Sequence, residues 1–173
     1  MKKEKENFLK PLILAGGKGI RLGNLTKNVP KPLLKINEKY FIEFILEKII
    51  YLGFNEVFIS ISYLSEVFFQ ILGHKYKNLE IKYFCEKEPL GTGGAIKNVF
   101  ENSNVKYLII FNGDSYCDFD LKLLIQEFTL KKKNMVLTCK IENTGRFGNI
   151  SFNGEKKIIN FFEKKIISSG YVN

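Results

Sequence analysis

A glycine-rich segment with interspersed cations, residues 12–34, contains the residue types best suited to hold phosphate. A short apolar run, Leu12 to Leu14, ends at Ala15-Gly16-Gly17, as a buried strand does when it opens into a loop. Glycine lets the backbone approach a ligand and direct its amide N–H groups toward it, and cations add charge-assisted donors. The loop carries four of each: Gly16, Gly17, Gly19 and Gly23, with Lys18, Arg21, Lys27 and Lys31. This segment therefore predicts a phosphate site.

Two familiar phosphate-binding motifs are not met in this segment. G-x-G-x-x-G starting at Gly17 would need glycine where Leu22 stands, and G-x-x-x-x-G-K-[ST] occurs nowhere in the chain. The alternative is a glycine-rich surface turn with solvated lysines. Pro30 and Pro32 flank Lys31 and restrict the backbone on both of its sides, which favours the phosphate site.

Asp114 ends another apolar run, residues 106–114, which is expected to form a strand buried on both faces. A carboxylate at a strand tip that faces phosphates suits Mg²⁺, because this small hard cation takes oxygen ligands and bridges phosphate oxygens. The alternative is a turn aspartate bonded to its own backbone, which is common after Asn-Gly. The residues alone leave both interpretations open.

The elements that must position these loops are predicted from periodicity and from turn residues. Strand-like and helix-like segments alternate and are followed by a hairpin across Asn153-Gly154, which favours an α/β fold with a mixed, mostly parallel sheet. The expected strands are 12–14, 56–62, 80–86, 106–114 and 135–141. The expected helices are 41–52, 65–73 and 121–133, and a further helix is expected to end at 99. Asp120 and Ser65 are expected to cap helices. Loops at Gly16, Glu88 and Asn112 each follow a strand end and so share one sheet edge, where such sheets bind ligands.

Bulk properties limit the classes of function. The 173 residues are enough for one domain. This domain is expected to span 1–173, and its first eight residues are expected to form a frayed leader. The net charge of +9 suits an anionic partner, but the densest basic run, Lys131 to Lys133, is expected to end a helix, so no nucleic acid is expected. Three widely spaced cysteines favour reduced thiols in a cytoplasmic protein, and no segment is apolar enough to span a membrane.

Five motifs of the chain resemble one family, the nucleotidyltransferases that activate sugar 1-phosphates (the nucleoside-diphosphate-sugar pyrophosphorylases). These motifs are LAGGKGIRL, PKPLL, EPLGTGGAI, FNGDSY and FFEKK. The combination is most similar to the bacterial heptose 1-phosphate guanylyltransferases. The resemblance implies a Rossmann-like three-layer sandwich of the nucleotide-diphospho-sugar transferase type. It also implies that a nucleoside triphosphate (GTP favoured) and a sugar 1-phosphate (heptose favoured) react to NDP-sugar and pyrophosphate, with Mg²⁺, for lipopolysaccharide or capsule biosynthesis. A homo-oligomer is a further expectation.

The same resemblance implies roles for individual residues. The catalytic residues are expected to be Arg21, Lys31 and Asp114, with Asp114 also holding the metal. The nucleotide is expected to contact Leu14, Ala15, Gly16, Gly17, Gly19, Glu88, Pro89, Gly91 and Thr92. Glu88 could accept two hydrogen bonds from the guanine edge, and a solvated loop glutamate is the alternative. The sugar phosphate is expected at Asn112, Gly148, Glu163 and Lys164, with a hairpin and a surface ion pair as the alternative.

One departure from the family keeps other functions open. Similar proteins continue beyond the final residues SSGYVN, and the family's second metal-binding aspartate lies in that continuation, so no residue here is assigned to it. A non-catalytic nucleotide or sugar-nucleotide binding module, or an inactive fragment, is therefore an alternative. Within the enzyme class, thymidylyl, uridylyl and cytidylyl transfer remain alternatives to guanylyl transfer. A basic nucleic-acid-binding protein is a further one, with affinity falling steeply as salt rises.

Overall fold

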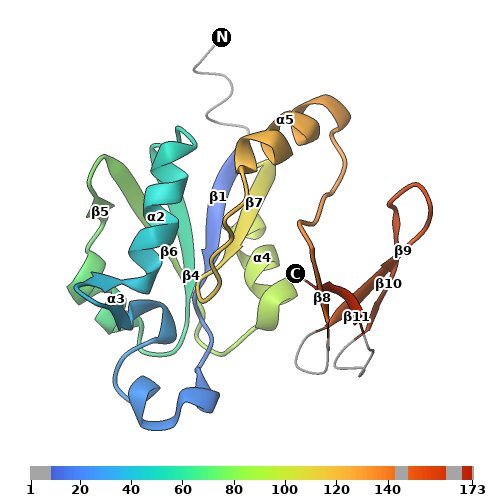
Figure 1. Cartoon of the computed structure of the whole chain (residues 1–173). Coiled ribbons are helices and arrows are strands. Elements are labelled where there is room, and N and C mark those ends of the chain that lie inside the picture. Colours follow the sequence, from blue (N-terminus) through green and yellow to red (C-terminus); the bar gives the residue numbers. More distant parts are fainter. Residues whose placement is uncertain (1–8, 143–147, 163–168, 173) are drawn as a thin grey trace. The chain divides into compact units, whose positions relative to one another are not determined.

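The computed structural model describes residues 9–142, 148–162 and 169–172 (Figure 1). The chain divides into two compact units, residues 1–119 and 120–173, and each is described by itself. The expectation of a single domain stays a prediction. Among the described residues, none of the helices combines the length and the apolar character that crossing a bilayer requires.

The first unit alternates strands with helices. Its elements are β1 (Leu9–Leu14), the 3₁₀ segments η1 (Ile20–Thr26) and η2 (Lys31–Leu33), β2 (Lys35–Ile36), β3 (Lys39–Tyr40), α2 (Phe41–Tyr51), β4 (Glu56–Ile61), α3 (Ser65–Leu72), β5 (Lys75–Tyr76), β6 (Leu79–Cys85), α4 (Gly91–Glu101) and β7 (Tyr107–Asn112).

Five of these strands form one mixed sheet in the order β5-β6-β4-β1-β7. The four longer strands are parallel, and β5 alone runs antiparallel, to β6. Leu14 pairs with Ser60 of β4 and with Asn112 of β7, so three neighbouring strands end at the same level. This register confirms the expected mostly parallel mixed sheet and brings the loops after these strands to one edge.

Helices cover both faces of this sheet, so the first unit has three layers (Figure 1). Ile13 and Ile59 contribute to a large core with the buried sides of α2 and α3. Leu12 and Phe58, one residue away in each strand, pack on the opposite face in a smaller core with Val99 of α4. The alternation follows from the two-residue repeat of a strand, and burial on both faces explains the apolar sequence of β1 and β4.

Helix α2 forms where its sequence predicts. Ile42, Ile45, Leu46 and Ile49 are buried, and their spacing places them on one helical face. At its start the Glu43 carboxylate accepts a hydrogen bond from the Tyr40 N–H at 2.7 Å, which closes a capping box.

The second unit consists of α5 (Leu121–Lys131) and four strands: β8 (Cys139–Glu142), β9 (Asn149–Phe152), β10 (Ile158–Phe162) and β11 (Ser169–Val172). These strands form an antiparallel sheet in the order β10-β9-β11-β8. Asp120 caps α5 as predicted, because its carboxylate accepts the Lys122 N–H at 3.0 Å. The helix ends at Lys131, with Lys132 in a left-handed conformation.

Four predictions about local structure were wrong in detail. Leu64, with a φ of 56°, stands at the N-cap of α3 in place of Ser65 and makes no side-chain cap. The apolar run of β7 is not buried on both faces, because β7 is an edge strand and Ile110 is 43% exposed. Strand β8 begins at Cys139, later than expected. The β9–β10 turn is longer than two residues, because Asn153 accepts the Lys157 N–H at 3.0 Å and so closes a five-residue loop.

Candidate functional site

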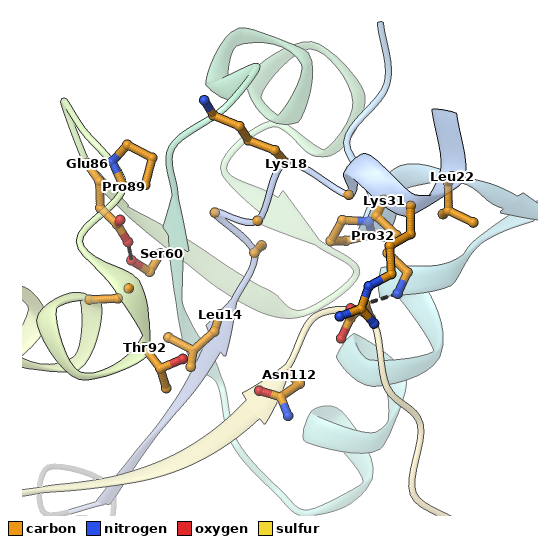
Figure 2. A pocket seen from close by; sticks show the side chains of 18 residues that line it. Leu14, Lys18, Leu22, Lys31, Pro32, Ser60, Glu86, Pro89, Thr92 and Asn112 are labelled. Atoms are coloured by element: carbon orange, nitrogen blue, oxygen red, sulfur yellow. Dashed lines mark hydrogen bonds and ion pairs between the residues drawn. The ribbon is translucent and has the colours of Figure 1, made fainter. Parts of the chain in front are cut away.

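A cavity of about 730 Å³ lies in the first unit, where β1, β4, β6 and β7 end. Its wall is formed by the first glycine-rich loop, by the second glycine-rich loop, which joins β6 to α4, and by the end of β7 (Figure 2). The lining residues are Leu14, Ala15, Gly16, Gly17, Lys18, Gly19, Arg21, Leu22, Lys31, Pro32, Ser60, Glu86, Pro89, Gly91, Thr92, Ala95, Asn112 and Asp114. The expected meeting of three loops at one sheet edge is therefore confirmed.

The first glycine-rich loop presents bare backbone donors to this cavity. The Ala15 N–H donates to the Ser60 carbonyl at 2.8 Å, which continues the sheet by one residue beyond β1. From Gly16 to Gly19, no hydrogen bond to another described residue engages the amide N–H groups. Consecutive free amides beside basic side chains form a concave anion site, so this loop has the donors that phosphate requires.

Thr26 holds this loop in shape. Its side chain is almost fully buried, and its hydroxyl donates to the Gly19 carbonyl at 3.0 Å and to the Gly23 carbonyl at 3.3 Å. Gly19 has a φ of +62°, and a Cβ there would lie 3.0 Å from the Thr26 methyl group. Glycine is required at this position for both reasons.

Lys31 and Asp114 meet across the cavity floor. The Lys31 Nζ lies 2.8 Å from Asp114 Oδ2, and the two side chains are 38% and 44% exposed. Lys31 begins the short η2 turn, in which Pro32 and Leu33 are buried. Pro30 at the N-cap and Pro32 within the turn restrict the backbone on both sides of Lys31.

Glu86 occupies the opposite side of the cavity, beside Pro89 (Figure 2). Its Oε1 accepts the Ser60 hydroxyl at 2.7 Å, and its Oε2 accepts the Leu90 N–H at 2.9 Å. Both carboxylates of the lining are thus engaged, Glu86 by these donors and Asp114 by Lys31. The lining cations Lys18 and Arg21 have no partner among the described residues. Positive charge therefore exceeds negative charge in the cavity lining, which favours an anionic ligand.

Helix α4 begins at the same cavity. Gly91 and Thr92, its first two residues, line the wall. The N-cap residue Leu90 provides no side-chain hydrogen bond, and no acidic residue stands in the first turn. The first amides of a helix lack intrahelical partners and carry a partial positive charge, so this end of the cavity also attracts electron-rich groups.

The donor set fits a cation that arrives with a phosphate ligand. No group of three or more His, Cys, Asp or Glu side chains that could hold a metal occurs among the described residues. One carboxylate, Asp114, stands beside the phosphate-binding loop. Mg²⁺ is commonly held by one or two carboxylates together with substrate phosphates and water, and Asp114 suits that arrangement.

Most of the sequence-predicted residues line this one cavity. They are Leu14, Ala15, Gly16, Gly17, Gly19, Arg21, Lys31, Pro89, Gly91, Thr92, Asn112 and Asp114. Glu88 is exposed and is not among the lining residues. Gly148 lies in the second unit, directly before β9. Glu163 and Lys164 lie outside the described residues. The roles assigned to all these residues stay predictions.

Sequence reasoning did not single out Ser60 or Glu86. Ser60 is a fully buried hydroxyl within the apolar strand EVFISI, and a polar side chain in such a run needs a partner. Glu86 directly follows β6, which is where parallel sheets bind ligands. These two signals could have identified the pair.

The chain matches one family model and is similar to two known proteins over most of its length. The family model described as "Nucleotidyl transferase" matches residues 10–166. The chain is 37% identical over 167 residues to D-glycero-alpha-D-manno-heptose 1-phosphate guanylyltransferase from Campylobacter jejuni subsp. jejuni serotype O:2, covering 95% of this chain and 73% of that protein. The protein of the same name from Aneurinibacillus thermoaerophilus is 32% identical over 166 residues, with 95% and 72% covered.

A solved structure shares the fold. HddC from Yersinia pseudotuberculosis, complexed with GMP-PN, matches with a TM-score of 0.76 and 28% identity over 95% of this chain and 73% of that chain. The backbone similarity supports the Rossmann-like arrangement expected from the sequence.

Proposed function

The chain belongs to the nucleotidyl transferase family, and from this premise we propose that it joins GTP and a heptose 1-phosphate to give the GDP-sugar and pyrophosphate. The run of free amides from Gly16 to Gly19, beside Arg21 and Lys31 in one cavity, is the observation that carries the proposal. The choice of guanine and heptose rests on the two relatives named for that reaction.

The reaction requires one in-line displacement. An oxygen of the sugar 1-phosphate forms a bond to the α-phosphorus, and the bond from that phosphorus to the bridging oxygen of pyrophosphate breaks. The attacking phosphate is already ionised, so no general base is needed. Amide N–H groups of the first loop, with Arg21 and Lys31, align the triphosphate and neutralise its charge. Alignment of two bound reactants contributes roughly 7–11 kcal/mol in favourable cases.

A divalent cation completes the charge balance of such sites, and we propose Mg²⁺ held by Asp114. When bound, it supplies positive charge to the phosphate oxygens. The 2.8 Å pair between Lys31 and Asp114 means that, in the free protein, each of these charges neutralises the other. A triphosphate gives Lys31 an anionic partner of higher charge and so releases Asp114 for the cation.

For the second substrate, we propose that Asn112, Gly148, Glu163 and Lys164 bind the sugar phosphate. Asn112 lines the cavity. Gly148 is exposed, and its backbone N–H and carbonyl are suited to a polar ligand. The roles of Glu163 and Lys164 rest on their match to the family motif.

For the base, we propose that Glu88 accepts the two adjacent donors of guanine. Glu88 has no partner among the described residues, so its carboxylate is free to accept, and its neighbour Pro89 lines the cavity. A bidentate pair of this kind discriminates by about 1–3 kcal/mol in base recognition elsewhere.

Pyrophosphate release separates this function from a binding module that does not turn over. We expect release only when GTP, heptose 1-phosphate and Mg²⁺ are all present. Lys31→Ala and Asp114→Ala should each lower kcat/KM by about a hundredfold or more, because each removes a charge that acts on the reacting phosphates. Lys97→Ala is the matched control, since that side chain is 75% exposed and pairs with the surface residue Glu101.

A panel of GTP, UTP, CTP and dTTP in the same assay identifies the base. Glu88→Gln should reduce the preference for GTP over the other three by about tenfold while the melting temperature stays unchanged. Nucleotide binding by wild-type protein without any pyrophosphate release would favour the binding module. Wild-type turnover of UTP, CTP or dTTP above GTP would contradict the choice of guanine.

A further inference from the structure

The Glu86 carboxylate joins three segments of the chain at the cavity wall. Its Oε1 accepts the hydroxyl of Ser60 on β4 at 2.7 Å, and its Oε2 accepts the backbone N–H of Leu90, directly before α4, at 2.9 Å. Glu86 itself directly follows β6. One side chain therefore connects the ends of two parallel strands to the start of a helix.

Gly16 of the first glycine-rich loop lies near the same group. A Cβ on Gly16 would lie 3.6 Å from Glu86 Oε1 and 3.3 Å from the Ser62 Cβ. Glu86 thus lines the same cavity as both glycine-rich loops (Figure 2).

Within the part of the chain that the structure describes, few other contacts hold residues 87–90 in place. Residues 87–90 are all exposed, so burial of apolar area contributes little to fixing them. Ser60, in contrast, is fully buried, so the carboxylate is bonded to a group in the packed interior. A loop without such an anchor would lose its conformational freedom only when the ligand binds, which weakens binding.

We propose that Glu86 is a positioning residue. Its carboxylate fastens the loop at 87–90 to β4, so that Pro89, Gly91 and Thr92 hold their ligand-binding positions before the nucleotide arrives. Each oxygen already accepts one hydrogen bond from the protein, which favours a supporting role for Glu86 and leaves direct contact with the ligand to the loop. The nature of the ligand rests on the proposed function, whereas the anchoring does not.

The first measurement follows the anchor itself in the nucleotide-free protein. Amide hydrogen exchange at Leu90 should be at least about tenfold faster in Glu86→Ala than in wild type, because its acceptor is lost. Glu86→Gln should keep the protection, since the amide oxygen can accept from Leu90 while its NH₂ donates to the Ser60 hydroxyl. Glu101→Gln, on the exposed end of α4, is the matched control.

The second measurement follows function. Glu86→Ala should raise the KM for GTP about tenfold, because in this variant the loop at 87–90 is no longer anchored before GTP binds. It should change kcat by less than about threefold, because Arg21, Lys31 and Asp114 are intact. Ser60→Ala, which loses one of the two bonds, should raise the KM by about threefold, and Glu86→Gln by less. Thermal melting identifies any variant that fails to fold, and Ser60→Ala and Glu86→Gln then carry the test.

Three outcomes would overturn the proposal. The first is unchanged Leu90 exchange in folded Glu86→Ala. The second is a Glu86→Gln variant with protected Leu90 but GTP binding as weak as that of Glu86→Ala, which would mean that the charge acts on the ligand directly. The third is a loss confined to kcat. Absence of turnover in wild type would count against the proposed function alone, since Leu90 exchange and GTP binding are still measured.

Discussion

At the scale of single residues, Gly113 shows how closely the site is packed. Its N–H donates to the Leu14 carbonyl at 2.9 Å, which ties the residue before Asp114 to the tip of β1. A Cβ at this position would lie 2.8 Å from the Leu14 carbonyl oxygen and 3.2 Å from Pro32. Neither a backbone carbonyl at a strand end nor a proline ring can move easily. Glycine here is a requirement of space.

Gly113→Ala should therefore destabilise the fold by about 2 kcal/mol, the usual cost of forcing extra volume into a packed region. Urea denaturation measures this loss in the free energy of unfolding. Gly154→Ala is the control, because a Cβ there meets nothing within 4 Å, and its effect should stay within about 0.5 kcal/mol. Equal stability of the two variants would mean that β1 and β7 can separate at no cost.

The sequence was sufficient to predict which loops line the cavity, and insufficient to distinguish two glutamates. The loop residues follow from local chemistry, since glycines, prolines and cations act through their own backbone and charge. Glu86 lies two residues before Glu88, the first residue of the motif EPLGTGGAI. Only the pairing of β4 with β6, which places Ser60 opposite Phe84, brings a buried hydroxyl within reach of Glu86. Such a contact depends on tertiary structure.

At the scale of elements, ion pairs fasten α2 to its neighbours. Glu47 of α2 pairs with Lys39 of β3 and, at 2.7 Å, with Lys77, and it accepts the Tyr76 hydroxyl at 3.2 Å. Hydrogen bonds from Lys39 and Lys77 lower the pKa of the Glu47 carboxyl from 4.5 to about 2. The Tyr76 pKa is raised, first by burial and then by the nearby carboxylates of Glu43 and Glu47.

This pKa shift gives a pH-dependent stability with a defined sign. A carboxyl whose folded pKa is lowered contributes stability that is fully present above its unfolded pKa of 4.5 and is lost as the pH falls toward about 2. Because the Glu47 side chain is 38% exposed, solvent screening limits the effect to about 1 kcal/mol or less.

Urea denaturation of wild type and Glu47→Gln between pH 6 and pH 2.5 tests this expectation. Wild type should be more stable at pH 6, and the difference should shrink steadily below about pH 4.5. High salt at pH 6 should reduce it as well, since exposed ion pairs are screened. A difference that is constant over the whole pH range would show that Glu47 acts through packing.

Elements were predicted more reliably than their ends and neighbours. The helical spacing in α2 and the β-rich run of β4 identify both elements, because each pattern reports a local periodicity. Ile110 shows the limit. An apolar run indicates burial on both faces, but β7 lies at the edge of its sheet, and strand order is set by long-range pairing.

At the scale of the whole molecule, positive charge and the separation into two units bear on how substrates are held. The net charge of +9 favours encounter with doubly or triply charged phosphates. Every residue that lines the cavity belongs to the first unit. Of the proposed sugar-phosphate residues, Gly148, Glu163 and Lys164 belong to the second. The two substrates should therefore leave different footprints along the chain.

Amide hydrogen exchange on the full chain, with GTP and Mg²⁺ and then with heptose 1-phosphate added, reveals these footprints. GTP at about a hundred times its Kd should slow exchange in residues 15–19 and 90–93 by up to about a hundredfold, because a ligand suppresses the openings of the state it binds. Peptides covering 148 and 163–164 should respond only when the sugar phosphate is added. The β9–β10 turn, residues 153–157, serves as the internal reference. Protection by GTP at 148–164 with none at 15–19 would contradict the assignment of the triphosphate to the first glycine-rich loop, since bare amides that bind phosphate cannot exchange freely while it is bound.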